Sequence, residues 1–317
     1  MNDLIFHIGL TKTGSSFLQR KVFLGKMHTL SRSVDWTSDS KSAAEFQDFF
    51  LRESPHIWSE KAGKDFFLDL FGDVDDTALI SHESLFSHIP FLPDNGSIEA
   101  EPELLAQRLK NINDFCCVSG RVKVFFFFRM QADWLASMYA HVAYALEKPS
   151  QVDFEQRVRN LLALDNKMAH ILEYDRLYQC LSDMLGTESV LAIPYEKFSD
   201  AKVWRSIEAF TGISGLYDRI PFGDTSVNTK RVDDGKSWHT SRDRNGILGF
   251  QVSTETKRFL KRTVGGTALV GILDRWRPKS KILMSEELRE EVTGYYKTSN
   301  ERLSILTGYD LGRYGYY

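Results

Sequence analysis

The stretch LIFHIGLTKTGSS, residues 4–16, decides the expected fold. Its apolar part, residues 4–8, is typical of a buried strand, and the loop Gly9–Ser16 leads into a helix predicted over Ser15–Leu24. Such a loop turns backbone N–H groups inward, and the first turn of the helix adds further N–H groups and the positive end of its dipole. The sequence therefore predicts an anion site between the first strand and the first helix.

One position separates this loop from the loop of nucleotide-hydrolysing proteins. A Walker A loop has a lysine directly after its second glycine, which reaches the β- and γ-phosphates, and then a hydroxyl residue that holds magnesium. Here Ser15 takes the place of that lysine, and the cation of the loop is Lys12 in the middle of the turn. The pattern indicates phosphate recognition without nucleotide hydrolysis. The alternative is an ordinary strand–turn–helix junction whose serines only cap the helix.

A second segment carries a related signal. The run Val122–Phe128 is β-branched and aromatic, as in a strand buried on both faces of a parallel sheet, and helical periodicity follows it. Arg129 then lies at the carboxyl edge of a central strand, where open α/β sheets bind ligands, and Ser137 lies about two helical turns further on. The alternatives are an arginine paired with a carboxylate and a serine that faces solvent.

These two motifs resemble those of the sulfotransferase superfamily. Residues 12–16 are similar to the family's 5′-phosphosulfate loop, and Arg129 with Ser137, eight residues apart, is similar to its 3′-phosphate pair. Residues 129–139 look most like a bacterial branch often associated with cell-surface saccharides. They differ from the cytosolic animal enzymes, which usually carry Asn-Pro after the arginine and a second arginine where Trp134 stands.

Weaker similarities extend the resemblance over almost the whole chain. Residues 190–198 are similar to a later strand of the family that ends in Tyr-Glu, and residues 299–316 to the end of the same bacterial branch. Residues 226–231 are similar to a loop that closes over the nucleotide, which makes cofactor-binding candidates of Asn228, Lys230 and Arg231. The poorest match is the segment 26–76.

The alternation of strands and helices predicts an α/β protein with a P-loop-type three-layer fold, in which helices flank a central parallel sheet. Further strands are expected over 77–81 and 190–193, and further helices over 102–113, 131–146 and 201–210. By the resemblance, residues 1–317 form a single sulfotransferase domain. Its residues 220–317 would then provide a C-terminal loop and a helical part that cover the cofactor and acceptor cleft.

Composition narrows the class of protein. A formal net charge of −3 and a pI near 6.3 lack the basic signature of a nucleic-acid-binding protein. No apolar run approaches the roughly 20 residues of a membrane-spanning helix, and the first residues lack the basic start of a signal peptide. The 3 cysteines and 8 histidines show no metal-ligand spacing. We therefore expect a cytoplasmic protein without a metal or a transmembrane segment, of undetermined oligomeric state.

The resemblance implies transfer of a sulfuryl group from 3′-phosphoadenosine 5′-phosphosulfate (PAPS) to a hydroxyl or amine of an acceptor, with a saccharide as the expected acceptor. The product nucleotide would be 3′-phosphoadenosine 5′-phosphate (PAP). Lys12 would neutralise charge on the bridging oxygen as its bond to sulfur breaks, and Arg129 with Ser137 would hold the 3′-phosphate. The 5′-phosphate would be held by the backbone N–H groups of Thr13, Gly14, Ser15 and Ser16.

The acceptor also needs a general base, and the segment after the expected strand 77–81 offers two. Glu83 is preferred because alternation along a strand gives it the direction of Ser81, whereas His82 would point away. In the alternative interpretation Glu83 caps the next helix and His82 packs beneath it. Two other functions stay open, a P-loop kinase-like phosphotransferase and a non-catalytic glycan-binding relative. The basic run 257–281 is either a solvated face or a surface for anionic polysaccharide or lipid headgroups.

Overall fold

The structure is a computed structural model, and it describes residues 3–23, 29–31, 38–71, 77–86, 90–92, 101–117, 120–163, 169–220, 237–240, 246–247, 250–251 and 281–317. The nucleotide-covering loop expected at 226–231, and the basic run 257–281 apart from its last residue, lie outside these ranges.

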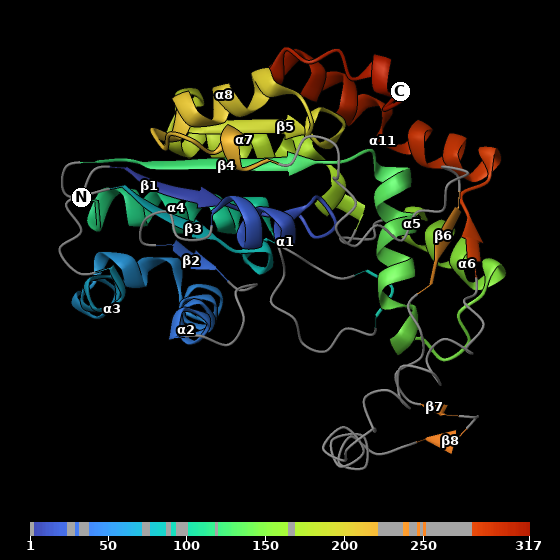
Figure 1. The fold of residues 1–317 in the computed structure, drawn as a ribbon, viewed down its shortest axis with the longest axis horizontal. Helices are drawn as coiled ribbons and strands as arrows, with labels where there is room; N and C mark the ends of the chain where they lie inside the picture. The colour runs from blue at the N-terminus through green and yellow to red at the C-terminus, as the bar shows by residue number, and fades with distance from the viewer. Residues whose placement is uncertain are drawn as a thin grey trace.

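A 5-stranded sheet forms the centre of the molecule (Figure 1). Each pair of neighbouring strands is parallel, so all carboxyl ends meet at one edge. In β1, Leu4 pairs with Ala78 on one side and with Val122 on the other, which places β1 in the middle. The spatial order of the strands is β2 (Thr29–Ser31), β3 (Ala78–Ser81), β1 (Leu4–His7), β4 (Val122–Phe128) and β5 (Val190–Pro194).

Helices cover both faces of the sheet, as the nearly uninterrupted apolar runs in its strands require. On one face Ile5 and Phe125 belong to a buried cluster with side chains of the helix after the first loop and of α8 (Ala201–Thr211). On the other face Phe6 and Phe126 belong to a larger cluster with side chains of the remaining long helices. The expected α/β fold with a central parallel sheet between helical layers is confirmed.

Helices that contribute side chains to the larger cluster are α2 (Ser38–Arg52), α3 (Lys61–Phe71), α4 (Pro102–Phe115), α5 (Gln131–Val142), α6 (Gln151–Leu162), α7 (Tyr174–Leu185) and α11 (Glu286–Thr307). Two small antiparallel pairs lie outside the main sheet, β6 (Ser237–His239) with β9 (Lys281–Leu283) and β7 (Gly246–Ile247) with β8 (Phe250–Gln251). Neither β2 nor these pairs were predicted from the sequence, because segments of two or three residues carry too little periodicity.

The helix after the first loop differs from the expected 15–24. It is α-helical only over Ser15–Phe17 (α1) and then widens into a π-helical turn, Leu18–Val22. Single π turns inside helices commonly occur where side chains serve a particular contact. Here the turn contains the buried Gln19, whose amide donates to the backbone carbonyl of Ser81 at 2.9 Å.

The long C-terminal helix α11 begins and ends with well-defined caps. The Ser285 hydroxyl accepts the N–H of Leu288, and Gly308 ends the helix with a φ of 73°. The helix packs against α7 and α5, next to the carboxyl edge of the sheet (Figure 1). No helix in the described ranges is long and apolar enough to cross a membrane.

Candidate functional site

The loop Gly9–Ser16 leaves the carboxyl end of β1 and turns tightly into α1. A Cβ atom at Gly9 would lie 2.2 Å from the Ser15 hydroxyl oxygen, so this approach of loop and helix requires glycine. Gly14 has a φ of 88°, a left-handed conformation that side chains disfavour. Both glycines of the predicted motif are therefore required by the geometry of the turn.

Polar groups of the helix start are directed into this turn. The hydrogen bonds of the helix begin with the N–H groups of Phe17 and Leu18, both donated to the carbonyl of Gly14, so the N–H groups before them lie outside the helical ladder. The hydroxyl of Ser15 is buried and has no hydrogen-bond partner among the described residues. A buried hydroxyl in that state is destabilising unless a bound group satisfies it.

Thr13 and Ser16 differ in their surroundings. The hydroxyl of Thr13 is buried and donates to the carbonyl of Leu10 at 2.5 Å. It therefore stabilises the turn from inside, and only the backbone of Thr13 remains for a ligand. Ser16 is half-buried at the start of the helix.

Lys12 has a φ of 69°, which is rare for a residue with a side chain and adds strain to the turn. Burial lowers the pKa of its ammonium group, the carboxylate of Glu83 raises it, and the guanidinium of Arg129 lowers it again. The three side chains come from the loops after β1, β3 and β4, yet they lie close enough to interact electrostatically. A Cβ at Gly9 would lie 3.2 Å from the Cβ of Glu83, which places that residue against the loop.

Arg129 points from the end of β4 toward the loop. Its guanidinium donates to the backbone carbonyl of Lys12 at 3.4 Å, and its Cζ lies 5.3 Å from the centre of the Tyr195 ring. The nearest recorded carboxylate oxygen, on Asp133, is 3.9 Å away, although the Arg129 side chain is only 12% exposed. A buried guanidinium usually has a carboxylate at hydrogen-bond distance. Arg129 thus has capacity for a further anion.

Trp134 of α5 also contacts the first loop. Its indole N–H donates to the carbonyl of Thr11 at 2.6 Å, so the start of α5 and the first loop are joined through this bond and through Arg129.

The remaining candidates from the sequence lie as follows. Ser137 is buried on α5, and none of the recorded contacts joins it to Arg129. His82 is fully buried and donates its backbone N–H to the carbonyl of His7, whereas Glu83 is half-buried at the start of a 3-10 turn. Three other cofactor candidates lie outside the residues that the structure describes. They are Asn228, Lys230 and Arg231.

A buried polar cluster beneath the loop was missed by the sequence analysis. The Nδ1 atom of His7 lies 2.8 Å from the hydroxyl of Ser81, and the amide of Gln19 donates to that hydroxyl at 3.2 Å and to the Ser81 carbonyl at 2.9 Å. Burial lowers the pKa of His7 to about 3, so its imidazole is neutral at physiological pH. The cluster joins β1, the helix after the loop and the strand that leads to Glu83.

The C-terminal segment supplies two further groups that sequence reasoning missed. Arg289 of α11 donates to Asp133 at 3.0 Å, and the hydroxyl of the penultimate residue, Tyr316, donates to Glu196 at 2.8 Å. The other carboxylate oxygen of Glu196 accepts the N–H of Met130 at 3.5 Å, next to Arg129. Burial raises the pKa of Glu196, and the Tyr316 hydroxyl partly offsets that rise. No group of His, Cys, Asp and Glu side chains in the described ranges is arranged to hold a metal ion.

Comparison with known proteins finds similarity among solved structures. No protein-family model matches the chain, and no curated protein matches it. Among solved structures, the chain is similar to the crystal structure of a sulfotransferase from Alicyclobacillus acidocaldarius, with 17% sequence identity and a TM-score of 0.47. The similarity covers 98% of this chain and 97% of the other.

Proposed function

We propose that this protein is a sulfotransferase that moves a sulfuryl group from PAPS to a hydroxyl or amine of a saccharide. The proposal rests on the proximity of two half-buried cations, Lys12 and Arg129, at the N-terminal end of a helix. Glu83 lies beside them. Cations and a helix start together attract a multiply charged phosphate compound. The loop lacks the lysine that a nucleoside triphosphate would need.

In this proposal the donor lies along the carboxyl edge of β1 and β4. The backbone N–H groups of residues 13–16 and the Ser15 hydroxyl bind the 5′-phosphate. Arg129 binds a phosphate through charge-assisted hydrogen bonds, because its guanidinium contacts a carbonyl and an aromatic ring and has its carboxylate neighbour, Asp133, only at 3.9 Å. The 3′-phosphate role of Arg129 with Ser137, and the covering roles of Asn228, Lys230 and Arg231, follow from the family resemblance.

Lys12 would act in the transfer step itself. As the bond between sulfur and the bridging oxygen breaks, negative charge grows on that oxygen, and the ammonium group stabilises it. The surroundings of Lys12 favour this role, because burial and Arg129 make its charge less stable in the free protein. Negative charge that develops in the transition state therefore interacts with an ammonium group whose positive charge the free protein does not fully stabilise.

Glu83 is the proposed general base, with His82 as the alternative. The acceptor oxygen attacks sulfur, the new sulfur–oxygen bond forms, and the acceptor proton passes to the carboxylate. Glu83 is half-buried beside Gly9 and interacts electrostatically with Lys12. His82 is fully buried, which disfavours direct contact with an acceptor. The saccharide assignment follows from the resemblance of residues 129–139 to the bacterial branch.

Calorimetry with PAP, AMP and magnesium-ATP tests the donor assignment, and an acceptor screen with labelled PAPS then tests transfer. We expect PAP to bind more tightly than AMP and labelled sulfuryl groups to appear on a saccharide. Equal affinities for PAP and AMP would contradict the assignment. Tight binding of magnesium-ATP would favour the kinase-like alternative, and binding of polysaccharide without any affinity for PAP would favour the glycan-binding alternative.

A further inference from the structure

Two carboxylates flank Arg129, and neither forms a close ion pair with it. Asp133 lies one helical turn further along the chain, with one oxygen 3.9 Å from the guanidinium. Glu196 follows β5 and accepts the N–H of Met130, the residue next to Arg129. The charge of Arg129 also influences the pKa of Glu196. In a buried site of low polarity, a carboxylate this close would normally close the gap and neutralise the guanidinium.

Each of these carboxylates is instead bonded to a group from the end of the chain. The Oδ1 atom of Asp133 accepts from Arg289 at 3.0 Å, while its Oδ2 atom faces Arg129. The Oε2 atom of Glu196 accepts from the hydroxyl of Tyr316 at 2.8 Å. Tyr316 is held firmly in place. Tyr316 is fully buried, and its backbone carbonyl accepts from the amide of Asn300 on α11 at 2.9 Å.

We infer that α11 and the last residues of the chain hold Asp133 and Glu196 in their own hydrogen bonds, and thereby keep the charge of Arg129 available for an anionic ligand. Arg289 and Tyr316 are positioning residues in this inference, because they act through the two carboxylates and not through the ligand. The inference rests on the proposed function, in which Arg129 binds a phosphate of the donor.

The physical reason is the competition between carboxylates and phosphate for one guanidinium. Asp133 bears one negative charge between two arginines, so Arg289 balances that charge and Arg129 keeps an excess of positive charge. Without Arg289 the buried carboxylate would lose its hydrogen-bonded cation, and closing the gap of 3.9 Å to Arg129 would be favourable. A phosphate would then have to displace an internal ion pair.

The test uses Arg289→Gln, Asp133→Asn and the double variant in the full chain, with PAP and AMP affinities measured by calorimetry. The glutamine keeps much of the length of Arg289 and removes its charge. We expect Arg289→Gln to weaken PAP binding by about 10-fold or more, the size expected for loss of one charge-assisted contact to phosphate. Adding Asp133→Asn should restore most of the PAP affinity, because the competing carboxylate is gone.

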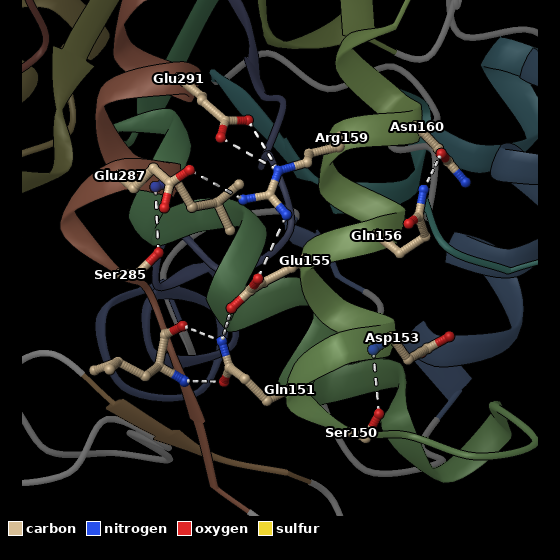
Figure 2. Close-up of polar contacts among 12 residues, drawn as sticks. Ser150, Gln151, Asp153, Glu155, Gln156, Arg159, Asn160, Ser285, Glu287 and Glu291 are labelled. Carbon is tan, nitrogen blue, oxygen red and sulfur yellow. Dashed lines mark hydrogen bonds and ion pairs between the residues drawn. The ribbon is translucent and has the colours of Figure 1, made fainter.

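Arg159→Gln is the matched control, since it removes an arginine that also joins α11 to a neighbouring helix. Figure 2 shows Arg159 of α6 between Glu155 of the same helix and Glu287 and Glu291 of α11, with its Nε atom 3.2 Å from Glu291. Arg159 forms ion pairs with these three glutamates, and its side chain is 40% exposed. The control should leave PAP affinity within about 2-fold of the wild type, on the basis that exposed ion pairs contribute little.

The outcomes separate the inference from the function on which it rests. Wild-type protein that prefers PAP, together with loss in Arg289→Gln and recovery in the double variant, supports the inference. Unchanged PAP affinity in Arg289→Gln would overturn it and leave the donor assignment intact. Equal losses in the single and the double variant would also overturn it, because Arg289 would then act by its own contacts or by packing. Wild-type protein without preference for PAP would overturn the donor assignment, and the inference with it.

Discussion

Replacement of His7 by asparagine should flatten the dependence of stability on pH. His7 is fully buried, its pKa is lowered from 6.5 to about 3 by that burial, and its Nδ1 atom contacts the Ser81 hydroxyl at 2.8 Å. The folded protein binds a proton at His7 less readily than the unfolded chain. The stability that this group contributes is therefore complete above pH 6.5 and is lost as the pH falls toward 3.

The size of the effect follows from the interval between the two pKa values. Each pH unit within the window changes the free energy of unfolding by about 1.4 kcal/mol, so the whole interval corresponds to about 5 kcal/mol. That amount is a large part of the stability of an ordinary domain. Unfolding by denaturant at a series of pH values from 7 to 4 would measure the part of it that falls between pH 6.5 and 4, about 3.4 kcal/mol, as the difference in slope between wild-type protein and the variant.

The asparagine side chain can accept a hydrogen bond near the position of Nδ1 but cannot titrate in this range. The variant should be less stable at neutral pH, since it leaves a cavity beside Phe23 and Phe125, and its stability should fall less steeply with acid. His56→Asn, at a site in an exposed stretch, separates this effect from the loss of an imidazole in general. Equal slopes for wild type and His7→Asn would refute the reasoning, as would a titration of His7 near pH 6.5 observed by NMR.

The other predictions concern the proposed transfer reaction. Lys12→Ala should lower turnover by roughly 10²-fold or more and weaken donor binding less, and near wild-type turnover at saturating substrate would remove Lys12 from the mechanism. Arg129→Ala should abolish most of the preference for PAP over AMP. Calorimetry should show that the difference between the two binding free energies falls by about 1.5–3 kcal/mol. Glu83→Gln should reduce turnover by roughly 10²–10⁴-fold with nucleotide affinity nearly intact, and His82→Asn should be milder. The reverse ranking would assign the base to His82, and a lowered melting temperature in Glu83→Gln would favour a capping role.

Much of the main sheet could be predicted because its strands carry strong local signals. The predicted strand 122–128 matches β4 in both bounds, and the predicted strands 77–81 and 190–193 match β3 and β5 within one residue. Uninterrupted β-branched and aromatic runs of this kind have few alternatives to a buried parallel strand. The helix after the first loop was predicted less well, because its π turn serves the contact between Gln19 and Ser81, which lie 62 positions apart.

Some residues of the candidate site could likewise be predicted from the sequence, and others could not. Lys12 was identifiable because a loop with two glycines after an apolar strand is a local pattern, and Arg129 because it follows a buried strand directly. Neither pattern contains information about Arg289 or Tyr316. The resemblance of residues 299–316 gave no role beside Arg129 to Tyr316, and the contact of Arg289 with Asp133 spans 156 positions of sequence.

Local sequence was enough to predict the turn with two glycines after the first strand and the type and approximate bounds of most strands and helices, because these depend on backbone conformation and on periodicity over a few residues. Which charges meet depends on the tertiary structure. The order β3-β1-β4 brings Glu83, Lys12 and Arg129 to one edge, and the return of α11 places Arg289 against Asp133. The physical reason is that electrostatic interaction depends on distance and burial in space, and both are set by strand pairing and helix packing between segments far apart in the chain.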